Sequence, residues 1–441
     1  MRLRLTNFAK ISDAEINIDG IAIIVGPNNS GKSTVGKAID AVFASVTDIK
    51  GKMRTSKLNM MLNGMAKVLD STGLEELPFG GFDITGYTYG FLRQLTDKMT
   101  KDEIKGVLYQ KIDTICNEYF FEMVSESDAY LTKKNQIIDD LANTIKSVMD
   151  VSDDVYERRI ITNNFDSMFN GNINNIANNQ PANLTIYIKD KEIRCEFQNN
   201  ICNDFKSEVV LKNKAFYIDN PFVIDRLNTE DSNFVGMGGQ PSYENRLYSR
   251  MLDDAVDDSD KALREILADK KTNDIISVLN KVIPGKILRR QKYEYEVPEK
   301  GFLDIRSLST GLKSFAIIKR LIDTGIMNDK DVVILDEPEI HLHPEWQKVY
   351  AELVVLLQKC FDFHIIVTTH SSKFLRSLEF YSRKHAIANR CNYYISNIDP
   401  NGDVSFSDTT ANLNEIYKHM VKPSMDLDLE EEEWESWSMN G

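Results

Sequence analysis

Residues 26–33, GPNNSGKS, are the stretch of sequence that decides the fold. They match the pattern GxxxxGK[ST], in which glycines let the backbone approach a phosphate closely and the loop N–H groups cradle the anion together with the next helix N-terminus. We expect Lys32 to add a charge at the β- and γ-phosphates and the Ser33 hydroxyl to ligate Mg²⁺. The candidate nucleotide-binding residues of this loop are Gly26, Asn28, Asn29, Ser30, Gly31, Lys32, Ser33 and Thr34.

The sequence on both sides of the loop has the pattern that a phosphate-binding loop requires. Residues 21–25, IAIIV, are continuously apolar, which predicts a strand buried on both faces. Residues 33–46 place apolar side chains on one helical stripe, so an amphipathic helix is expected after the loop. Apolar and polar residues alternate in parts of 1–20, which indicates further short strands.

A pair of carboxylates follows a second apolar strand, which we predict over residues 332–335. Open α/β sheets bind ligands at the C-terminal ends of their parallel strands, so Asp336 and Glu337 should lie near the phosphate loop. Asp336 is suited to hold Mg²⁺ through water, and Glu337 is suited to polarise the attacking water as general base. The sequence therefore predicts a metal site at Ser33 and Asp336 and a catalytic glutamate.

Two further short motifs indicate the class of nucleotide hydrolase. The string LSTGLK at residues 308–313 resembles the LSGGQ signature of ABC-type ATPases, although Thr310 replaces a glycine and Leu312 replaces the glutamine. The string TTHS at residues 368–371 ends another predicted strand and resembles the switch histidine of these ATPases, which makes His370 a candidate catalytic residue. The signature adds Ser309, Thr310 and Gly311 to the nucleotide-binding set, whereas the Q-loop glutamine stays open between Gln94 and Gln240.

The string DEPEIHLHP at residues 336–344 looks like the Walker B motif and D-loop of the prokaryotic AAA-type ABC ATPases, the RecF, SMC and OLD relatives. The four motifs also occur in the order of that family. The resemblance covers residues 1–46 and about 303–398, roughly a third of the chain. It implies an α/β fold: an ABC-type P-loop ATPase head, with a mixed sheet and flanking helices, that carries a large and mostly helical insertion.

The chain is expected to divide into four segments. We expect the N-terminal part of the head at 1–50, an insertion at 51–300, the C-terminal part of the head at 301–425 and an acidic tail at 426–441. Within the insertion, a capping box at Thr100 and Glu103 predicts the start of a helix. Alternation over 184–197 predicts a β-hairpin. Twelve asparagines between 163 and 203 indicate loops.

Composition limits the classes of protein that the chain can belong to. Of 441 residues, 42% are hydrophobic, which excludes a mainly disordered chain. The 53 basic and 67 acidic residues give a net charge of −14, which argues against a protein that simply coats nucleic acid. No apolar run reaches the roughly 18 residues of a membrane span, the N-terminus lacks a signal-peptide pattern, and the five cysteines form no CxxC pair. We therefore expect a cytoplasmic protein with no membrane partner.

The family resemblance also implies a mechanism. Two ATP molecules with Mg²⁺ would lie between two heads of a homodimer or higher homo-oligomer. The helix N-terminus at 309–311, with its partial positive charge, would face the γ-phosphate held by the other subunit. Glu337 would drive hydrolysis, and His370 would sense or stabilise the γ-phosphate.

Two biological roles follow from the resemblance. The motif strings look most like stand-alone ATPases of bacterial anti-phage systems, such as the ATPase subunits of Septu or PARIS, which work with a separately encoded effector. This implies an ATPase that controls a nuclease or toxin. The alternative is a DNA-repair or DNA-end-binding ATPase of the RecF/SMC type. The clusters Arg158-Arg159 and Arg289-Arg290-Lys292 would then be candidates for nucleic-acid contact, although such clusters are more often solvated faces.

Overall fold

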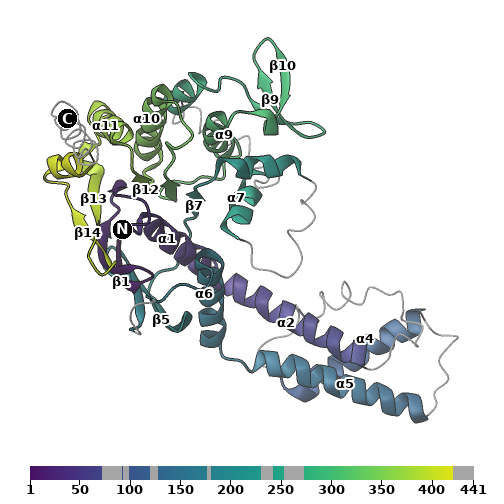
Figure 1. Cartoon of the computed structure of the whole chain (residues 1–441). Coiled ribbons are helices and arrows are strands. Elements are labelled where there is room, and N and C mark those ends of the chain that lie inside the picture. Colours follow the sequence, from purple (N-terminus) through teal and green to yellow (C-terminus); the bar gives the residue numbers. More distant parts are fainter. Residues whose placement is uncertain are drawn as a thin grey trace, which may run out of the picture. The chain divides into compact units, whose positions relative to one another are not determined.

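The computed structural model of the chain (Figure 1) describes residues 1–71, 92, 99–119, 128–175, 180–229, 242–252 and 273–420. They belong to two compact units, one of Met1–Thr47 and Ile161–Gly441 and the other of Asp48–Ile160. Gln94, Gln240 and the expected acidic tail lie outside the described residues.

The first unit is built on a mixed sheet. Across the described residues it has eleven strands in the order β6-β5-β4-β1-β2-β14-β13-β3-β12-β11-β7. Neighbouring strands are parallel from β13 through β3, β12 and β11 to β7, and antiparallel from β6 through β5, β4 and β1 to β2. The strands are β1 Arg2–Phe8, β2 Ile11–Asn17, β3 Ile21–Val25, β4 Ala182–Ile188, β5 Lys191–Gln198, β6 Ile201–Ser207, β7 Ala215–Ile218, β11 Val332–Asp336, β12 His364–Thr369, β13 Cys391–Ile398 and β14 Val404–Asp408.

Helices cover both faces of the parallel strands, which confirms the expected α/β class with a mixed sheet and flanking helices. Helix α1 packs on one face, where it shares a core with Ala22 and Ile24 of β3. Helices α9, α10 and α11 pack on the other face, where their core includes Ile21 and Ile23. The apolar run of β3 is continuous because its alternate side chains enter different cores. These helices are α1 Lys32–Val46, α9 Thr310–Asp323, α10 Pro344–Phe361 and α11 Ser372–Lys384.

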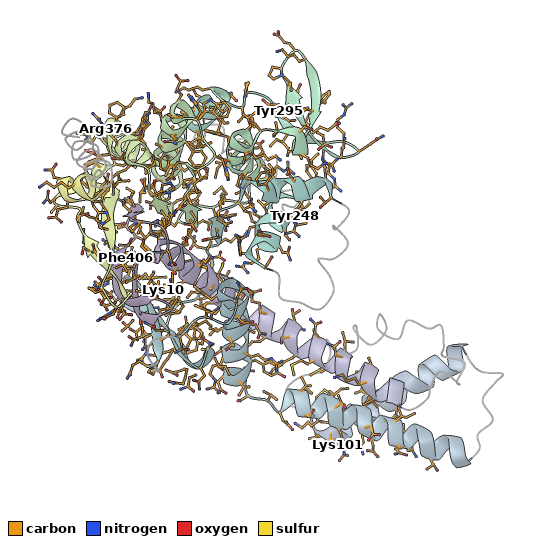
Figure 2. All side chains as sticks on the ribbon, in the orientation of Figure 1. Lys10, Lys101, Tyr248, Tyr295, Arg376 and Phe406 are labelled. Atoms are coloured by element: carbon orange, nitrogen blue, oxygen red, sulfur yellow. The ribbon has the colours of Figure 1, made fainter. Side chains whose placement is uncertain are left out.

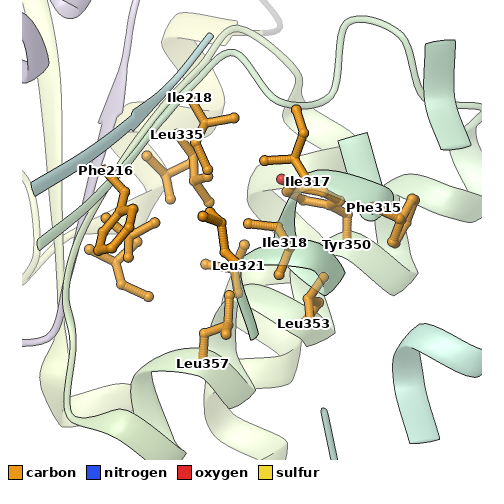
Figure 3. Close-up of a cluster of buried hydrophobic side chains, with 14 of the residues drawn as sticks. Phe216, Ile218, Phe315, Ile317, Ile318, Leu321, Leu335, Tyr350, Leu353 and Leu357 are labelled. Atoms are coloured by element: carbon orange, nitrogen blue, oxygen red, sulfur yellow. The ribbon is translucent and has the colours of Figure 1, made fainter. Parts of the chain in front are cut away.

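Figure 3 shows how one of these cores joins strands of the main sheet to the helices that cover this face. Phe216 of β7 and Leu335 of β11 lie in the same buried cluster as Leu321 of α9 and Leu357 of α10. On the opposite face, α1 lies very close to β11: a Cβ atom added at Gly36 would come within 2.6 Å of Ile334 Cγ2. The ends of β3, β11 and β12 are thus fixed by packing on both sides of the sheet.

Part of the range expected to form the insertion belongs to the main sheet. Strands β4 to β7 all lie between residues 182 and 218, and β4 pairs with β1 so that Ile186 is opposite Leu3. The hairpin predicted over 184–197 is confirmed as β4 and β5. Its buried residues, such as Leu184 and Ile193, join the α1 core, which explains their alternation with polar residues.

The second unit is helical in its described residues. Helices α2, α4 and α5 and the first part of α6 share a core that includes Met61, Ile104 and Leu141. The capping box predicted at the start of α4 is confirmed, because Thr100 N donates to Glu103 Oε2 at 2.7 Å and Glu103 N donates to Thr100 Oγ1 at 3.3 Å. The helices are α2 Ile49–Ser71, α4 Lys101–Tyr119, α5 Asp128–Met149 and α6 Asp153–Phe169.

A small antiparallel sheet and several short helices, among them η6 Ala388–Arg390, also belong to the described first unit. The sheet has the order β10-β9-β8, and Tyr295 on its middle strand is labelled in Figure 2. None of the described helices combines the length and apolar character needed to cross a membrane. The elements are η2 Pro221–Asn228, α7 Tyr243–Met251, β8 Ile287–Arg289, β9 Tyr293–Val297, β10 Gly301–Asp304 and η5 Ile305–Ser307.

Candidate functional site

The phosphate loop needs its glycines for two different reasons. Gly31 has a φ of 75°, in the left-handed region that glycine adopts without strain. Gly26 lies against β13, where an added Cβ would come within 1.8 Å of Ser396 Oγ. Helix α1 starts directly after the loop, and no acidic residue in its first turn offsets the positive end of the helix dipole. The loop is therefore suited to bind an anion.

Lys32 is buried at the centre of the site, with 3% of its side chain exposed. Its Nζ donates to the carbonyl oxygens of Gly26 at 2.9 Å and Pro27 at 2.8 Å. The same atom lies 3.3 Å from Oε1 of Glu337. The structure therefore brings together the two charged residues that the sequence predicted from separate motifs.

Asp336 lies beside the start of α1, within hydrogen-bonding distance of Ser33, the other residue that the sequence predicts to hold the metal. Ser33 Oγ donates to Asp336 Oδ1 at 3.0 Å. The Asp336 carboxylate is also held by the hydroxyl groups of Tyr217, at 2.6 Å, and of Thr368. A hydroxyl and an oriented carboxylate are hard oxygen donors of the kind that Mg²⁺ prefers beside a nucleotide, so these residues fit the predicted metal.

Glu337 is held in place by its backbone. Its φ is 49°, and its N–H donates to both the carbonyl oxygen and Oγ1 of Thr368, at 3.2 and 3.0 Å. The carboxylate lies between Lys32 and His370, whose Nδ1 is 3.5 Å from Glu337 Oε2. The structure thus brings the candidate base and the candidate switch histidine together at the ends of β11 and β12.

The residues of the signature string lie at the N-terminus of α9. Ser309 is the N-cap residue, but its side chain makes no capping hydrogen bond, and the first turn holds no acidic residue. By contrast, side chains cap α10 and α11. A Cβ at Gly311 would lie 3.0 Å from the carbonyl oxygen of His341, so the start of α9 packs tightly on the turn after Glu337.

One pocket of about 1040 Å³ contains the phosphate loop. Asn28, Asn29, Ser30, Gly31, Lys32, Ser33 and Thr34 line it together with Asp336 and Glu337. Residues 309–311 and His370 are not among the described residues that line it. The chain's own signature residues therefore lie outside the pocket that contains its phosphate loop.

The pocket also has a polar wall that the sequence analysis missed. Lys10, in the turn between β1 and β2, donates to Asn29 Oδ1 at 2.8 Å, and its carbonyl oxygen accepts from the N–H of Val404 in β14 at 2.9 Å. Asn175 Nδ2 donates to Asp403 Oδ1 at 3.2 Å across two loops of this wall. The asparagine-rich stretch was the available signal, but it indicated only loops. The missed lining residues are Ala9, Lys10, Asn172, Asn174, Asn175, Asp219, Ile340, Asn401, Gly402 and Asp403.

Asp219 is a second missed carboxylate beside the predicted metal site. It follows β7, the neighbour of β11, and lines the pocket. Tyr243 of α7 donates its hydroxyl to Asp219 Oδ2 at 2.8 Å. Burial, and to a smaller extent the negative charge of Asp336, raises the pKa of Asp219.

Comparison with known proteins gives a family match and a set of similar structures. Residues 1–375 match the family model described as the AAA ATPase domain. An SMC head bound to the C-terminal winged-helix domain of ScpA is 13% identical, with 92% of this chain and 96% of that chain covered and a TM-score of 0.40. The SMC head domain from Thermotoga maritima is 13% identical, with coverage of 92% and 97% and a TM-score of 0.35.

An Smc head domain with an extended coiled coil, bound to the C-terminal domain of ScpA from Pyrococcus furiosus, is a further similar structure. It is 11% identical, with 95% of this chain and 99% of that chain covered and a TM-score of 0.40. No curated protein matches the chain.

Proposed function

The chain belongs to the AAA ATPase domain family, and from this premise we propose that it is a Mg²⁺-dependent ATP hydrolase that dimerises around ATP and controls a separately encoded effector. The effector would be a nuclease or toxin of a bacterial anti-phage system that acts in the cytoplasm. The observation that carries the proposal is the meeting of two motifs in one pocket. Lys32 lies beside Glu337, and Ser33 lies beside Asp336.

Each of these residues has a distinct part in the proposed reaction. The loop N–H groups, the α1 N-terminus and Lys32 bind the phosphates of ATP. Ser33 and Asp336 would hold Mg²⁺, which when bound neutralises charge on the β- and γ-phosphates. Glu337 orients the attacking water and accepts its proton. His370, which lies beside Glu337, would sense or stabilise the γ-phosphate.

The geometry of α9 supports a site that two subunits complete. Its N-terminus has neither a side-chain cap nor an acidic first turn, which leaves it suited to an anion, yet it lies outside the chain's own pocket. A second head could present its Ser309 and Gly311 to the ATP that the first head holds. Ile340, with 53% of its surface exposed, lies in the turn after Glu337, and the ring of Phe222, with 47% exposed, packs against His341 of the same turn. Both side chains would be covered in such a dimer.

The effector role is supported by the family resemblance of the motif strings and by the acidic net charge of −14. An acidic surface favours a protein partner over bare DNA. We propose that residues in the range 50–300 and the far C-terminus dock the effector, and that the ATP state sets its release.

The alternative, a DNA-repair ATPase that binds nucleic acid itself, would need basic residues available to phosphates. In the small sheet, Lys292 pairs with Asp304 at 2.9 Å and Arg290 lies over the ring of Phe302. In the second unit, Arg158 pairs with Asp154 at 3.0 Å. These contacts engage part of each basic cluster within the chain, and they add no support to the repair role.

The test uses the full chain and the Glu337→Gln variant, which should bind ATP and stay closed. Each is co-expressed with the neighbouring gene product and passed over a sizing column with Mg²⁺ and either ATP or ADP. We expect a head dimer with ATP, and co-elution of the neighbouring product that depends on the nucleotide. Glu415→Gln, which removes an exposed acid, is the matched control. A chain that stays alone yet binds duplex DNA with a steep salt dependence would support the repair role instead.

A further inference from the structure

Glu339 is a buried carboxylate that the proposed reaction does not yet use. It lies in the turn between β11 and α10, two residues after Glu337, and only 2% of its surface is exposed. Its Oε2 atom is buried and has no hydrogen-bond partner among the described residues. Burying an unpaired carboxylate oxygen costs stability, so a chain that keeps glutamate there needs another reason for it.

The other oxygen of this carboxylate holds the loop that follows β12. Oε1 accepts hydrogen bonds from the hydroxyl of Thr369 and from the backbone N–H of His370, the latter at 3.2 Å. The Thr369 hydroxyl in turn accepts from the N–H of Ser371 at 3.0 Å. Glu339 therefore fixes the backbone on both sides of His370.

A second connection runs between the same two segments. Gln347 of α10 donates through Nε2 to the carbonyl oxygens of Glu339 and Leu342, at 3.4 and 3.2 Å. Its Oε1 accepts from Ser371 Oγ at 3.3 Å. The turn after β11 and the loop after β12 are thus joined by polar contacts, which hold the two loops at a fixed separation.

The His370 imidazole needs this support because little else holds it. Its side chain is 46% exposed, and its Nδ1 lies 3.5 Å from Glu337 Oε2 and 3.9 Å from Glu339 Oε1. Its place beside Glu337 is therefore set largely by its backbone. A small displacement of this backbone would change the distance between the histidine and the candidate base.

We propose that Glu339 is a positioning residue for hydrolysis: it anchors the loop after β12 so that His370 stays beside Glu337. The inference rests on the proposed ATPase reaction and adds to it a residue that touches neither ATP nor Mg²⁺. The acceptor oxygen matters for this role, whereas the negative charge does not. Glutamine should therefore replace Glu339 with little loss, and leucine should not.

The experiment compares steady-state ATP hydrolysis by four variants of the full chain: Glu339→Gln, Glu339→Leu, His370→Ala and the Glu339→Leu/His370→Ala double variant. Nucleotide affinity and thermal melting are measured in parallel. Glu345→Leu, on the exposed first turn of α10, controls for removing an acid from the same segment. Thr369→Val is an isosteric second test, because it removes one donor to Glu339 while leaving the carboxylate in place.

We expect Glu339→Leu to lower kcat by about 10- to 100-fold while KM and nucleotide affinity stay close to wild type, as a misplaced catalytic group would. Glu339→Gln should stay within a few-fold of wild type. The double variant should be no slower than His370→Ala, because both changes remove the same contribution. Thr369→Val should also lower kcat, as Glu339→Leu does.

If the wild-type chain hydrolyses ATP, three results would overturn this inference without affecting the proposed function. They are an undiminished kcat in Glu339→Leu, a double variant slower than His370→Ala by the full factor of Glu339→Leu, and a loss confined to nucleotide affinity. A wild-type chain without ATPase activity would instead overturn the proposed function.

Discussion

Lys32 Nζ lies 3.3 Å from Oε1 of Glu337, although 305 positions of sequence separate the two residues. The pair joins the end of β3, which leads into the phosphate loop, to the end of β11. Strand β12 lies between these two strands and runs parallel to both. The lysine proposed to bind phosphate and the glutamate proposed to activate water thus meet at one edge of the sheet, where parallel strands end.

Replacing Lys32 with alanine should remove nucleotide binding. The ammonium group is the phosphate loop's own cation, and losing a charge-assisted contact of this kind should weaken ATP affinity by on the order of 100-fold or more. Titration with a fluorescent ATP analogue measures this, with Lys359→Ala on α10 as a control that removes an exposed lysine far along the chain. Near-normal affinity in Lys32→Ala would refute the phosphate-loop assignment.

Replacing Ser309 with arginine should leave ATP binding to a single head largely intact and block hydrolysis, because in the proposed dimer this residue contacts the nucleotide held by the neighbouring head. A mixture with Lys32→Ala subunits sharpens the test. Each mixed dimer has one site with both changes and one site with neither. If the sites work independently, an equal mixture should recover about a quarter of wild-type turnover. Loss of ATP binding by Ser309→Arg alone would contradict a site shared between subunits.

A methyl group at Gly36 should destabilise the first unit. The added Cβ would lie 2.6 Å from Ile334 Cγ2, so α1 must move away from β11, at a cost of about 1–3 kcal/mol. Gly106→Ala is the matched control, because nothing lies within 4 Å of its added Cβ in α4. That change should stabilise its helix by about 0.5–1 kcal/mol. The free energy of unfolding in urea is measured for both variants. Equal changes in Gly36→Ala and Gly106→Ala would contradict the close packing of α1 on β11.

The stability of Glu339→Gln relative to wild type should rise with pH. Burial raises the pKa of Glu339, although the hydrogen bond from Thr369 opposes this rise. A carboxyl group whose pKa is higher in the folded than in the unfolded chain stabilises the fold at pH values below its unfolded pKa of about 4.3. This stabilisation is lost as the pH rises through the pKa of the folded state. Glutamine does not ionise, so the melting temperature of the variant minus that of wild type should be larger at pH 8 than at pH 5. A difference that is flat or falls with pH would contradict the burial of a charged oxygen.

The sequence predicted the parts of the site that lie on strongly patterned elements. Strands β3 and β11 are buried on both faces, so their apolar runs and the motifs that follow them could be read directly. The start of a helix could also be predicted, because Thr100 and Glu103 form a local capping box that the structure confirms. Local patterns of this kind need no knowledge of long-range pairing.

The remaining features depend on contacts that a single sequence does not contain. Strand β4 joins β1 across more than 170 positions, so its place in the main sheet could not be inferred from alternation alone. Asn175 and Asp403 form one wall of the pocket for the same reason. Glu339 was visible in its motif, but its burial and its bond to the N–H of His370 were not.

The measurement that tests the central claim most directly is ATP turnover by Glu337→Gln at saturating Mg²⁺ and ATP, with ATP affinity measured on the same sample. If Glu337 accepts the proton of the attacking water, turnover should fall by about 10²- to 10⁴-fold while ATP still binds. Unchanged turnover in a variant that binds ATP normally would show that Glu337 is not the base, and it would contradict the site described above.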